Sequence, residues 1–293
     1  MTIWGLAGAA YGVVLALAAL TQPIRRRHRA FAASGAYALA SLAAGSLGDD
    51  FFVNLFVPGG LLLSGYWLSG FFFRDPQPWL DAWLLRVDHA LGAERWVAWT
   101  PRAMAEFLEL SYAAVHPVVG GGAIYAATFG TEAVAHYWSL VLTSALASYA
   151  PLPWLRSRPP RMVEEGIRAK PGPRAEGPPS ATPHSTPRPP ACPEHSRGAC
   201  PERSRGARSA ATLRRLNTLI LDHASVQANT LPSGHVSGAV AAALGVMAVD
   251  VVVGSWLMVA AAVIAIASVA GRYHYVIDCM TGAAVALTIW RLM

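Results

Sequence analysis

The sequence is poor in charged residues. Only 14% of its 293 residues are Asp, Glu, Lys or Arg, whereas 54% are hydrophobic. Soluble domains carry roughly a quarter charged residues, so this composition excludes an ordinary soluble domain. Several windows of about 20 residues hold almost no charge, and that length is needed for a helix to cross the hydrocarbon core of a bilayer. The sequence therefore predicts a polytopic helical membrane protein.

Cysteine is also scarce. The chain has Cys192, Cys200 and Cys279, with neither a CxxC pair nor a Cys/His cluster at zinc spacing. This pattern excludes a disulfide framework and predicts no metal and no other cofactor. The first 20 residues lack the basic segment that opens a cleavable signal, so we expect the first apolar stretch to be retained.

The net charge of +6 comes from one region. Thirteen of the 23 basic residues lie within 156–215 together with five acidic residues, which gives +8 there and −2 in the remainder. A basic loop near anionic lipid headgroups explains this distribution better than nucleic-acid binding does. We therefore expect no nucleic acid as a partner, and no obligatory protein partner is evident.

Eight apolar segments are candidate spans. They are 3–20, 30–47, 52–73, 106–129, 133–152, 235–251, 253–270 and 275–290. The second is mostly Ala, Gly and Ser, so it is expected either to pack closely against a neighbour or to fail to cross. Between the third and fourth, segment 75–100 places Trp and Leu among charges at helical spacing, which is typical of a helix in the headgroup plane.

Four regions follow from this pattern. Residues 1–50 form extra N-terminal helices, 51–161 the first half of a membrane core, 162–211 an insertion and 212–293 the second half of the core. The insertion is rich in Pro, Gly, Ser and Arg without apolar periodicity, which predicts disorder. It contains the tandem repeat ACPEHSRG and ACPERSRG, typical of a recent insertion into a tolerant loop.

Three polar clusters fall at span ends on one side of the expected bundle. They are LPWLRSRPPR (152–161), LPSGH (231–235) and AGRYHYVIDCMTG (270–282). In the second, Ser233 is a good N-cap, and the first-turn amides of Gly234 and His235 favour an anion at the helix N-terminus. A turn followed by a cap explains the same residues without any ligand.

The third cluster adds an imidazole and a carboxylate. His274 and Asp278 are four residues apart and so share a helix face. A carboxylate there can hold one imidazole nitrogen and leave the other basic, although a purely stabilising polar pair has the same spacing. Arg158, Arg161 and Arg272 suit bidentate contact with phosphate, or the anchoring of headgroups. Together the clusters predict phosphoryl transfer through a histidine nucleophile.

At these residues the chain resembles the type 2 phosphatidic acid phosphatase superfamily, which includes lipid phosphatases and vanadium haloperoxidases. The resemblance covers roughly 52–293 without the insertion. Arg158-Pro159 matches the first motif, Pro-Ser-Gly-His at 232–235 the second, and His274 with Asp278 the third. The family's first-motif lysine would fall at Pro151 and its third-motif Ser-Arg at 267–268. The stretch RYHYVID is similar to the inositol-phosphorylceramide synthase-like branch, where Arg272 would substitute.

The resemblance implies an all-α fold with a six-helix phosphatase-like core and one or two extra N-terminal helices. It implies a metal-independent hydrolase of lipid phosphates or isoprenoid diphosphates, in which His274 attacks phosphorus, Asp278 orients it and His235 protonates the leaving alkoxide. The phosphate would be held by Arg158, Arg161, Ser233, Gly234 and Arg272. The alternatives are a phospholipid headgroup transferase and a non-catalytic binder or transporter of phosphate lipids.

The sidedness of the site depends on the second candidate span. If all eight segments cross, the basic segment RRRHR (25–29) shares a face with the site, and the positive-inside rule places both in the cytoplasm. If 30–47 does not cross, the site lies outside, as the resemblance implies for most lipid phosphatases. We expect the second arrangement, in a bacterial-type inner or plasma membrane with an extracytoplasmic active site.

Overall fold

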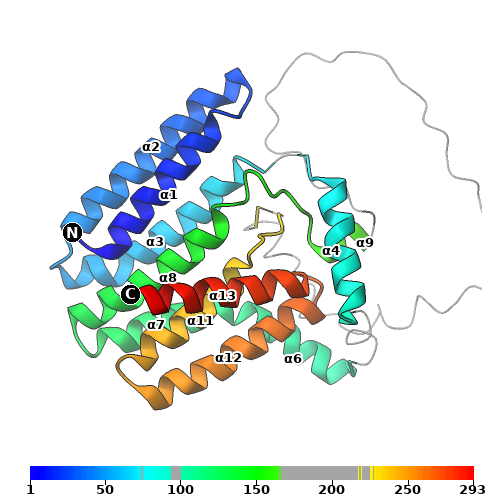
Figure 1. Ribbon diagram of the computed structural model, residues 1–293. Helices are drawn as coiled ribbons and strands as arrows, with labels where there is room; N and C mark the ends of the chain where they lie inside the picture. The colour runs from blue at the N-terminus through cyan, green and yellow to red at the C-terminus, as the bar shows by residue number, and fades with distance from the viewer. Residues whose placement is uncertain are drawn as a thin grey trace, which may run out of the picture.

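The computed structural model describes residues 1–73, 75–93, 100–164, 166, 217, 219, 225–226 and 228–293. Over these residues the fold is all-helical, as predicted, and Figure 1 shows its arrangement. The helices are α1 (Ile3–Ala19), α2 (Ile24–Ser46), α3 (Phe51–Gly70), α4 (Pro78–Ala90), α6 (Arg102–Ala113), α7 (Val115–Ala127), α8 (Thr131–Tyr149), α9 (Pro160–Glu164), α11 (Gly234–Met247), α12 (Val251–Ala270) and α13 (Val276–Leu292).

Short polar side chains begin several of these helices. Thr2, Asp50, Ser233 and Asp250 each accept a hydrogen bond from an amide in the first turn that follows. These amides have no partner within the helix itself, so a side-chain acceptor just before the apolar run stabilises the end. The expected spans 3–20, 52–73, 235–251 and 253–270 begin within two residues of α1, α3, α11 and α12, whereas α2 begins six residues before the expected span 30–47.

The predicted span 106–129 is wrong as a single helix. The chain forms α6 and α7 instead, with the break at Ala114. Pro117 provides the reason, because proline has no amide hydrogen and its ring collides with the carbonyl four residues earlier in a continuous helix. In the first turn of a new helix both problems disappear. The interfacial helix expected near 75–100 corresponds to α4, and residues 94–99 lie outside the described part of the chain.

Helix α11 lies at the centre of the fold and packs against α7, α8, α12 and α13 (Figure 1). Its residues from Val236 to Val246 are buried on every side, and most of them are Ala, Gly or Val. A helix that is apolar all round belongs in an interior. Because the side chains are small, the neighbouring helices approach it closely.

Helices α1 and α2 form an antiparallel pair (Figure 1). Small residues set their contact, since a Cβ atom added to Gly5 would lie 2.7 Å from the Cα of Gly45. A Cβ added to Gly8 would lie 2.5 Å from Oγ of Ser41. Of the two alternatives for the Ala/Gly/Ser-rich second segment, the structure shows close packing, and this segment lies against the whole length of the first.

Among the residues that the structure describes, two helices, α3 and α12, are long and apolar enough to cross a membrane. Their large side chains point outwards: the exposed fractions are 68% for Phe52 and 71% for Trp256. The core helix of a soluble protein would bury such residues instead. The length of α3 and α12 and the exposure of their large apolar side chains weakly indicate membrane association for the protein. Helices α1 and α11 are apolar but shorter.

Candidate functional site

Three segments that are distant in the sequence meet at one end of the bundle. An antiparallel bridge joins Ser157 to Asn229, through the amide of Asn229 donating to the Ser157 carbonyl at 2.9 Å. The amide of Ser233 donates to the carbonyl of Asp278 at 2.9 Å, and that of Arg161 to the carbonyl of Arg272 at 3.2 Å. The structure thus brings the three predicted polar clusters together.

The imidazole of His274 is buried and held on one side. Its Nδ1 lies 3.0 Å from Oδ1 of Asn229, while Nδ2 of Asn229 donates to Oγ of Ser157 at 2.9 Å. Since an amide oxygen can only accept, the hydrogen of the ring sits on Nδ1 and the lone pair on Nε2. This geometry leaves Nε2 as the basic, nucleophilic atom.

The carboxylate of Asp278 lies on the same side of the ring. Its Oδ2 is 3.6 Å from Nδ1 of His274 and accepts a hydrogen bond from the amide of Tyr275 at 2.9 Å. At 3.6 Å the carboxylate makes an electrostatic contact and no hydrogen bond. The direct partner of His274 is therefore Asn229, and Asp278 adds negative charge beside the same nitrogen.

The second histidine faces the free nitrogen of the first. Nδ1 of His235 lies 3.5 Å from Nε2 of His274, and the ring centroids are 5.5 Å apart. The other ring nitrogen of His235 lies 3.5 Å from the hydroxyl of Tyr112, whose ring stacks on the imidazole. A phosphoryl group between the two nitrogens needs more room than 3.5 Å, so a bound phosphate requires the rings to separate.

A stack of two tyrosine rings packs against the imidazole of His235. Tyr112 stacks on Tyr273 with ring centroids 3.9 Å apart, and the guanidinium of Arg161 lies 4.7 Å from the Tyr273 centroid. The hydroxyl of Tyr273 donates to Glu109. Burial, then the hydrogen bond to Glu109, raises the pKa of Tyr273, so the hydroxyl stays neutral and keeps donating. Arg161 thus reaches the site as a cation over an aromatic face.

Two of the predicted phosphate ligands are paired with carboxylates. Arg158 donates from its amide and from Nε to the two oxygens of Asp81, each at 2.8 Å. Arg272 donates from Nη1 to Asp88 at 2.6 Å and through Nε and Nη2 to Glu164. Burial lowers the pKa of Arg272, but the bonds to Glu164 and Asp88 outweigh it and raise the pKa. Arg272 is therefore a permanent cation whose charge is already balanced.

Ser233 and Gly234 form the start of α11, as the sequence predicted. Ser233 caps the helix by accepting from the amide of Val236 at 3.4 Å, and the amide of Gly234 donates to Oγ1 of Thr230 at 3.3 Å. A Cβ on Gly234 would lie 2.0 Å from the ring of Tyr149. The observed need for glycine is thus packing against Tyr149, and the Gly234 amide already has an acceptor.

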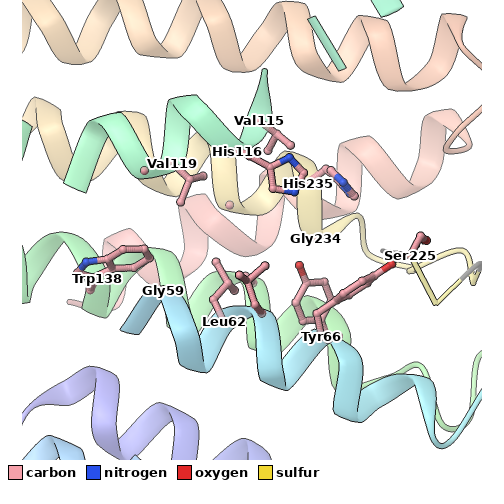
Figure 2. Close-up of a pocket in the computed structure, with 15 residues that line it drawn as sticks. Gly59, Leu62, Tyr66, Val115, His116, Val119, Trp138, Ser225, Gly234 and His235 are labelled. Carbon is pink, nitrogen blue, oxygen red and sulfur yellow. Dashed lines mark hydrogen bonds between the residues drawn. The ribbon is translucent and has the colours of Figure 1, made fainter. Parts of the chain in front are cut away.

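An apolar cavity of about 310 Å³ adjoins His235. It lies between α3, α7, α8 and α11, and Figure 2 shows His116 and His235 beside one another with Trp138 towards the opposite end. Tyr66 and Ser225 add polar groups near the histidines, with 2.9 Å between their hydroxyl oxygens. His274 and Asp278 do not line the cavity. His235 therefore separates the buried histidine from an apolar chamber.

Several residues of this region escaped the sequence analysis. Asn229 stands six residues before His235, and its signal was only that an amide precedes the Pro-Ser-Gly-His turn. Asp81 and Asp88 are seven apart on α4, hence on one face, which would have predicted a charged seam. Glu164 was assigned to the insertion at 162–211, yet it belongs to α9 and contacts Arg272. The remainder of that insertion, beyond 162–164 and Gly166, lies outside the described residues.

Comparison with known proteins gives no relative: no family model, no curated protein and no solved structure matches the chain. Within the part of the chain that the structure describes, no group of three or more His, Cys, Asp or Glu side chains is arranged to hold a metal ion. The functional assignment therefore depends on the geometry of the site itself.

Proposed function

We propose that this chain is an integral membrane phosphatase that hydrolyses a lipid phosphate or an isoprenoid diphosphate through a phosphohistidine. One observation carries the proposal. Nδ1 of His274 is held by Asn229, its Nε2 faces Nδ1 of His235, and His235 borders an apolar cavity. A held imidazole with a free second nitrogen is the arrangement required of a nucleophile, and a neighbouring imidazole supplies the proton.

The reaction follows from these atoms in two steps. Nε2 of His274 attacks phosphorus, the bond from phosphorus to the lipid oxygen breaks, and His235 gives a proton to the leaving alkoxide. Water then attacks the phosphohistidine, with His235 taking a proton from the water and His274 leaving as a neutral ring. Asn229 and Asp278 keep the ring oriented and offset the positive charge that it gains. The scheme uses no divalent cation.

Arginine side chains supply the charge around the phosphate. Arg161 extends over Tyr273 towards the aromatic stack beside His235. Arg158 and Arg272 are held by acidic side chains, so the phosphate has to compete with Asp81 for Arg158 and with Glu164 for Arg272. Glu164 is the weaker competitor because its side chain is 39% exposed, whereas that of Asp81 is 3% exposed. Ser233 and Gly234 shape the helix end that faces this cluster.

We further propose that the protein is a polytopic bundle, in which more helices than α3 and α12 cross the membrane. Helix α1 runs parallel to α3, since Trp4 donates to Asn54 and Tyr11 to the carbonyl of Gly65. Helix α2 returns antiparallel along α1 (Figure 1). If α3 crosses the bilayer, the length and direction of α1 and α2 favour crossing as well.

The arrangement of α1 and α2 also bears on which face of the membrane carries the site. The expectation of an extracytoplasmic site required segment 30–47 not to cross, but α2 lies along the whole of α1. The basic segment 25–29 then falls at the end of the bundle that carries the site (Figure 1). The connections at the opposite end, 47–50, 128–130 and 248–250, carry no Lys or Arg. By the positive-inside rule we propose a cytoplasmic site, against the face that the resemblance implies.

The test of function is hydrolysis by the purified full chain. Phosphate release is measured over a panel of lipid monophosphates and prenyl diphosphates without added divalent cation, and again with vanadate as an inhibitor. We expect turnover in the wild type, inhibition by vanadate, and loss of turnover in His274→Ala. His136→Ala is the matched control, because His136 is an exposed histidine on α8 outside the cavity. Equal activity in the two variants would reject the mechanism.

The same assay separates the alternatives. A headgroup transferase would release little free phosphate and would move a headgroup onto an added lipid alcohol, because an alcohol and not water would attack the phosphohistidine. A binder or transporter would retain the lipid phosphate unchanged, and His274→Ala would then alter no rate. Accessibility of a cysteine introduced at Arg29 to an impermeant thiol reagent, from outside intact cells, decides the sidedness.

A further inference from the structure

His235 lies between His274 and the apolar cavity. Nε2 of His274 faces His235, and His235 in turn lines the apolar cavity that His274 does not reach. In an in-line displacement at phosphorus the leaving oxygen departs on the side opposite the nucleophile. The leaving oxygen therefore lies next to His235, and whatever it carries continues into the cavity.

Two glycines leave room in the cavity for the group that the leaving oxygen carries. Gly120 follows His116 by four residues on α7, and Gly238 follows His235 by three on α11, so each glycine lies one turn below a histidine on the same face. Both line the cavity, and a Cβ added to either would meet nothing within 4 Å. Larger side chains at these positions would fill the room beside the histidines.

The cavity is closed at one end and open at its side. Trp138 is buried, with 4% exposed, and its ring lies 3.4 Å from a Cβ built on Gly59. It stands at the end of the chamber away from Ser225 (Figure 2). Leu63 and His116 line the cavity and are both exposed, so the chamber reaches the surface between α3 and α7. A chain attached to the phosphate can therefore enter laterally.

We infer that this cavity binds a single hydrocarbon chain of the leaving alcohol, and that Gly120, Gly238 and Trp138 set the length of chain that the enzyme prefers. This inference rests on the proposed function for the direction of the chain. A cavity of about 150 Å³ holds the six carbons of benzene, so about 310 Å³ holds roughly a dozen carbons. The substrate class is a lipid phosphate with one chain inside the protein, and any second chain remains in the bilayer.

Two neighbouring glycines provide the decisive comparison. Gly120→Leu places a leucine in the cavity, whereas Gly121→Leu places the same side chain on the exposed face of the same helix, where an added Cβ also meets nothing within 4 Å. The gain in helix propensity is equal in both. Rates are measured on n-alkyl monophosphates shorter and longer than about twelve carbons. We expect Gly120→Leu to lower the long-to-short ratio of kcat/KM about tenfold or more, and Gly121→Leu to leave it unchanged.

A binding measurement separates this inference from the proposed function. The probe is a dodecyl phosphonate, whose phosphorus–carbon bond cannot be hydrolysed. We expect Gly120→Leu and Gly238→Leu to weaken its binding about tenfold relative to Gly121→Leu. If no phosphate is hydrolysed but this difference in binding persists, the cavity stands as a chain site and the phosphatase falls. If the phosphonate binds equally to all three variants, the chain site is overturned even where hydrolysis is found.

Discussion

Oδ1 of Asn229 lies 3.0 Å from Nδ1 of His274, closer than the carboxylate of Asp278 at 3.6 Å. Asn229 is in turn fixed by Ser157, which belongs to the segment between α8 and α9. The imidazole proposed as the nucleophile is thus oriented by a neutral amide in direct contact and by a charge slightly farther away. An amide sets the tautomer without a full charge at hydrogen-bond distance.

The first prediction tests this contact. Asn229→Ala removes the acceptor for Nδ1, and we expect turnover to fall about tenfold to a hundredfold, the loss typical of groups that orient a metal-ligating imidazole. Asn229→Asp keeps an acceptor in place and should retain more activity than the alanine variant. The measurement is kcat on a lipid monophosphate.

A matched control exists at the other end of the bundle. Asn54 is also fully buried and accepts from Nε1 of Trp4 at 2.9 Å, far from the histidines. Asn54→Ala should lower stability to a similar extent but leave kcat unchanged. A loss of kcat as large in Asn54→Ala would show that Asn229 acts only through stability.

The second prediction concerns the proton donor. His235→Gln removes the group that we propose protonates the leaving alkoxide, and general acid catalysis contributes about 100- to 10,000-fold to such reactions. An aryl phosphate has a leaving group that departs without a proton. We therefore expect a much larger loss of kcat/KM on an alkyl phosphate than on p-nitrophenyl phosphate, with His274→Gln losing both. Equal losses on both substrates in His235→Gln would remove His235 from the role of acid.

The third prediction concerns the packing of Gly234 on Tyr149. Gly234→Ala would bring its Cβ within 2.0 Å of the Tyr149 ring, so the helix start or the ring has to move. Overpacking of this kind lowers the free energy of unfolding by about 1–3 kcal/mol. At Gly35 in α2 an added Cβ meets nothing within 4 Å, so Gly35→Ala should instead raise it by about 0.5–1 kcal/mol.

Thermal unfolding in detergent measures both glycine variants. The Tyr149→Leu background provides a further check, because a smaller side chain makes room for the methyl group. Destabilisation by Gly234→Ala should then shrink. If it persists in full, another contact is responsible.

The fourth prediction concerns Arg272, which is adjacent in sequence to the aromatic stack but is bound by two acids. Asp88 is 1% exposed and accepts hydrogen bonds from Nη1 of Arg272 and from the amide of Val276, so Arg272→Gln leaves a buried carboxylate without its cation. Removing one partner of a buried pair typically destabilises a protein by about 3–5 kcal/mol. Glu164→Gln should have a smaller effect, about 1 kcal/mol or less, because the Glu164 side chain is 39% exposed.

A double-mutant cycle decides whether Asp88 is the cause. In the Asp88→Asn background the carboxylate charge is absent, and Arg272→Gln should lose less stability than it does in the wild type. Additive effects of the two substitutions would mean that Arg272 stabilises the fold through another contact. Glu164→Gln should also lower KM for the lipid phosphate if Glu164 competes with the substrate for this arginine.

The sequence by itself determined most of the helices and the polar residues that their ends carry. Asp50, Ser233 and Asp250 each stand just before an apolar run and cap the start of α3, α11 and α12. Capping is local and needs no tertiary contact. The same holds for His235, His274 and Asp278, which short spacings mark as a candidate site. The division of 106–129 into α6 and α7 was missed, although Pro117 carried its signal, and so were the short helix α9 and the start of α2 at Ile24.

The tertiary structure decided which groups are partners. Arg158 meets Asp81 across 77 positions, Arg272 meets Asp88 across 184, and His274 meets Asn229 across 45. Each pairing depends on the directions in which whole helices cross, which local residue patterns do not encode. The apolar cavity has the same origin, since it is the space that α3, α7, α8 and α11 leave between them, with small side chains such as Gly120 and Gly238 on its walls.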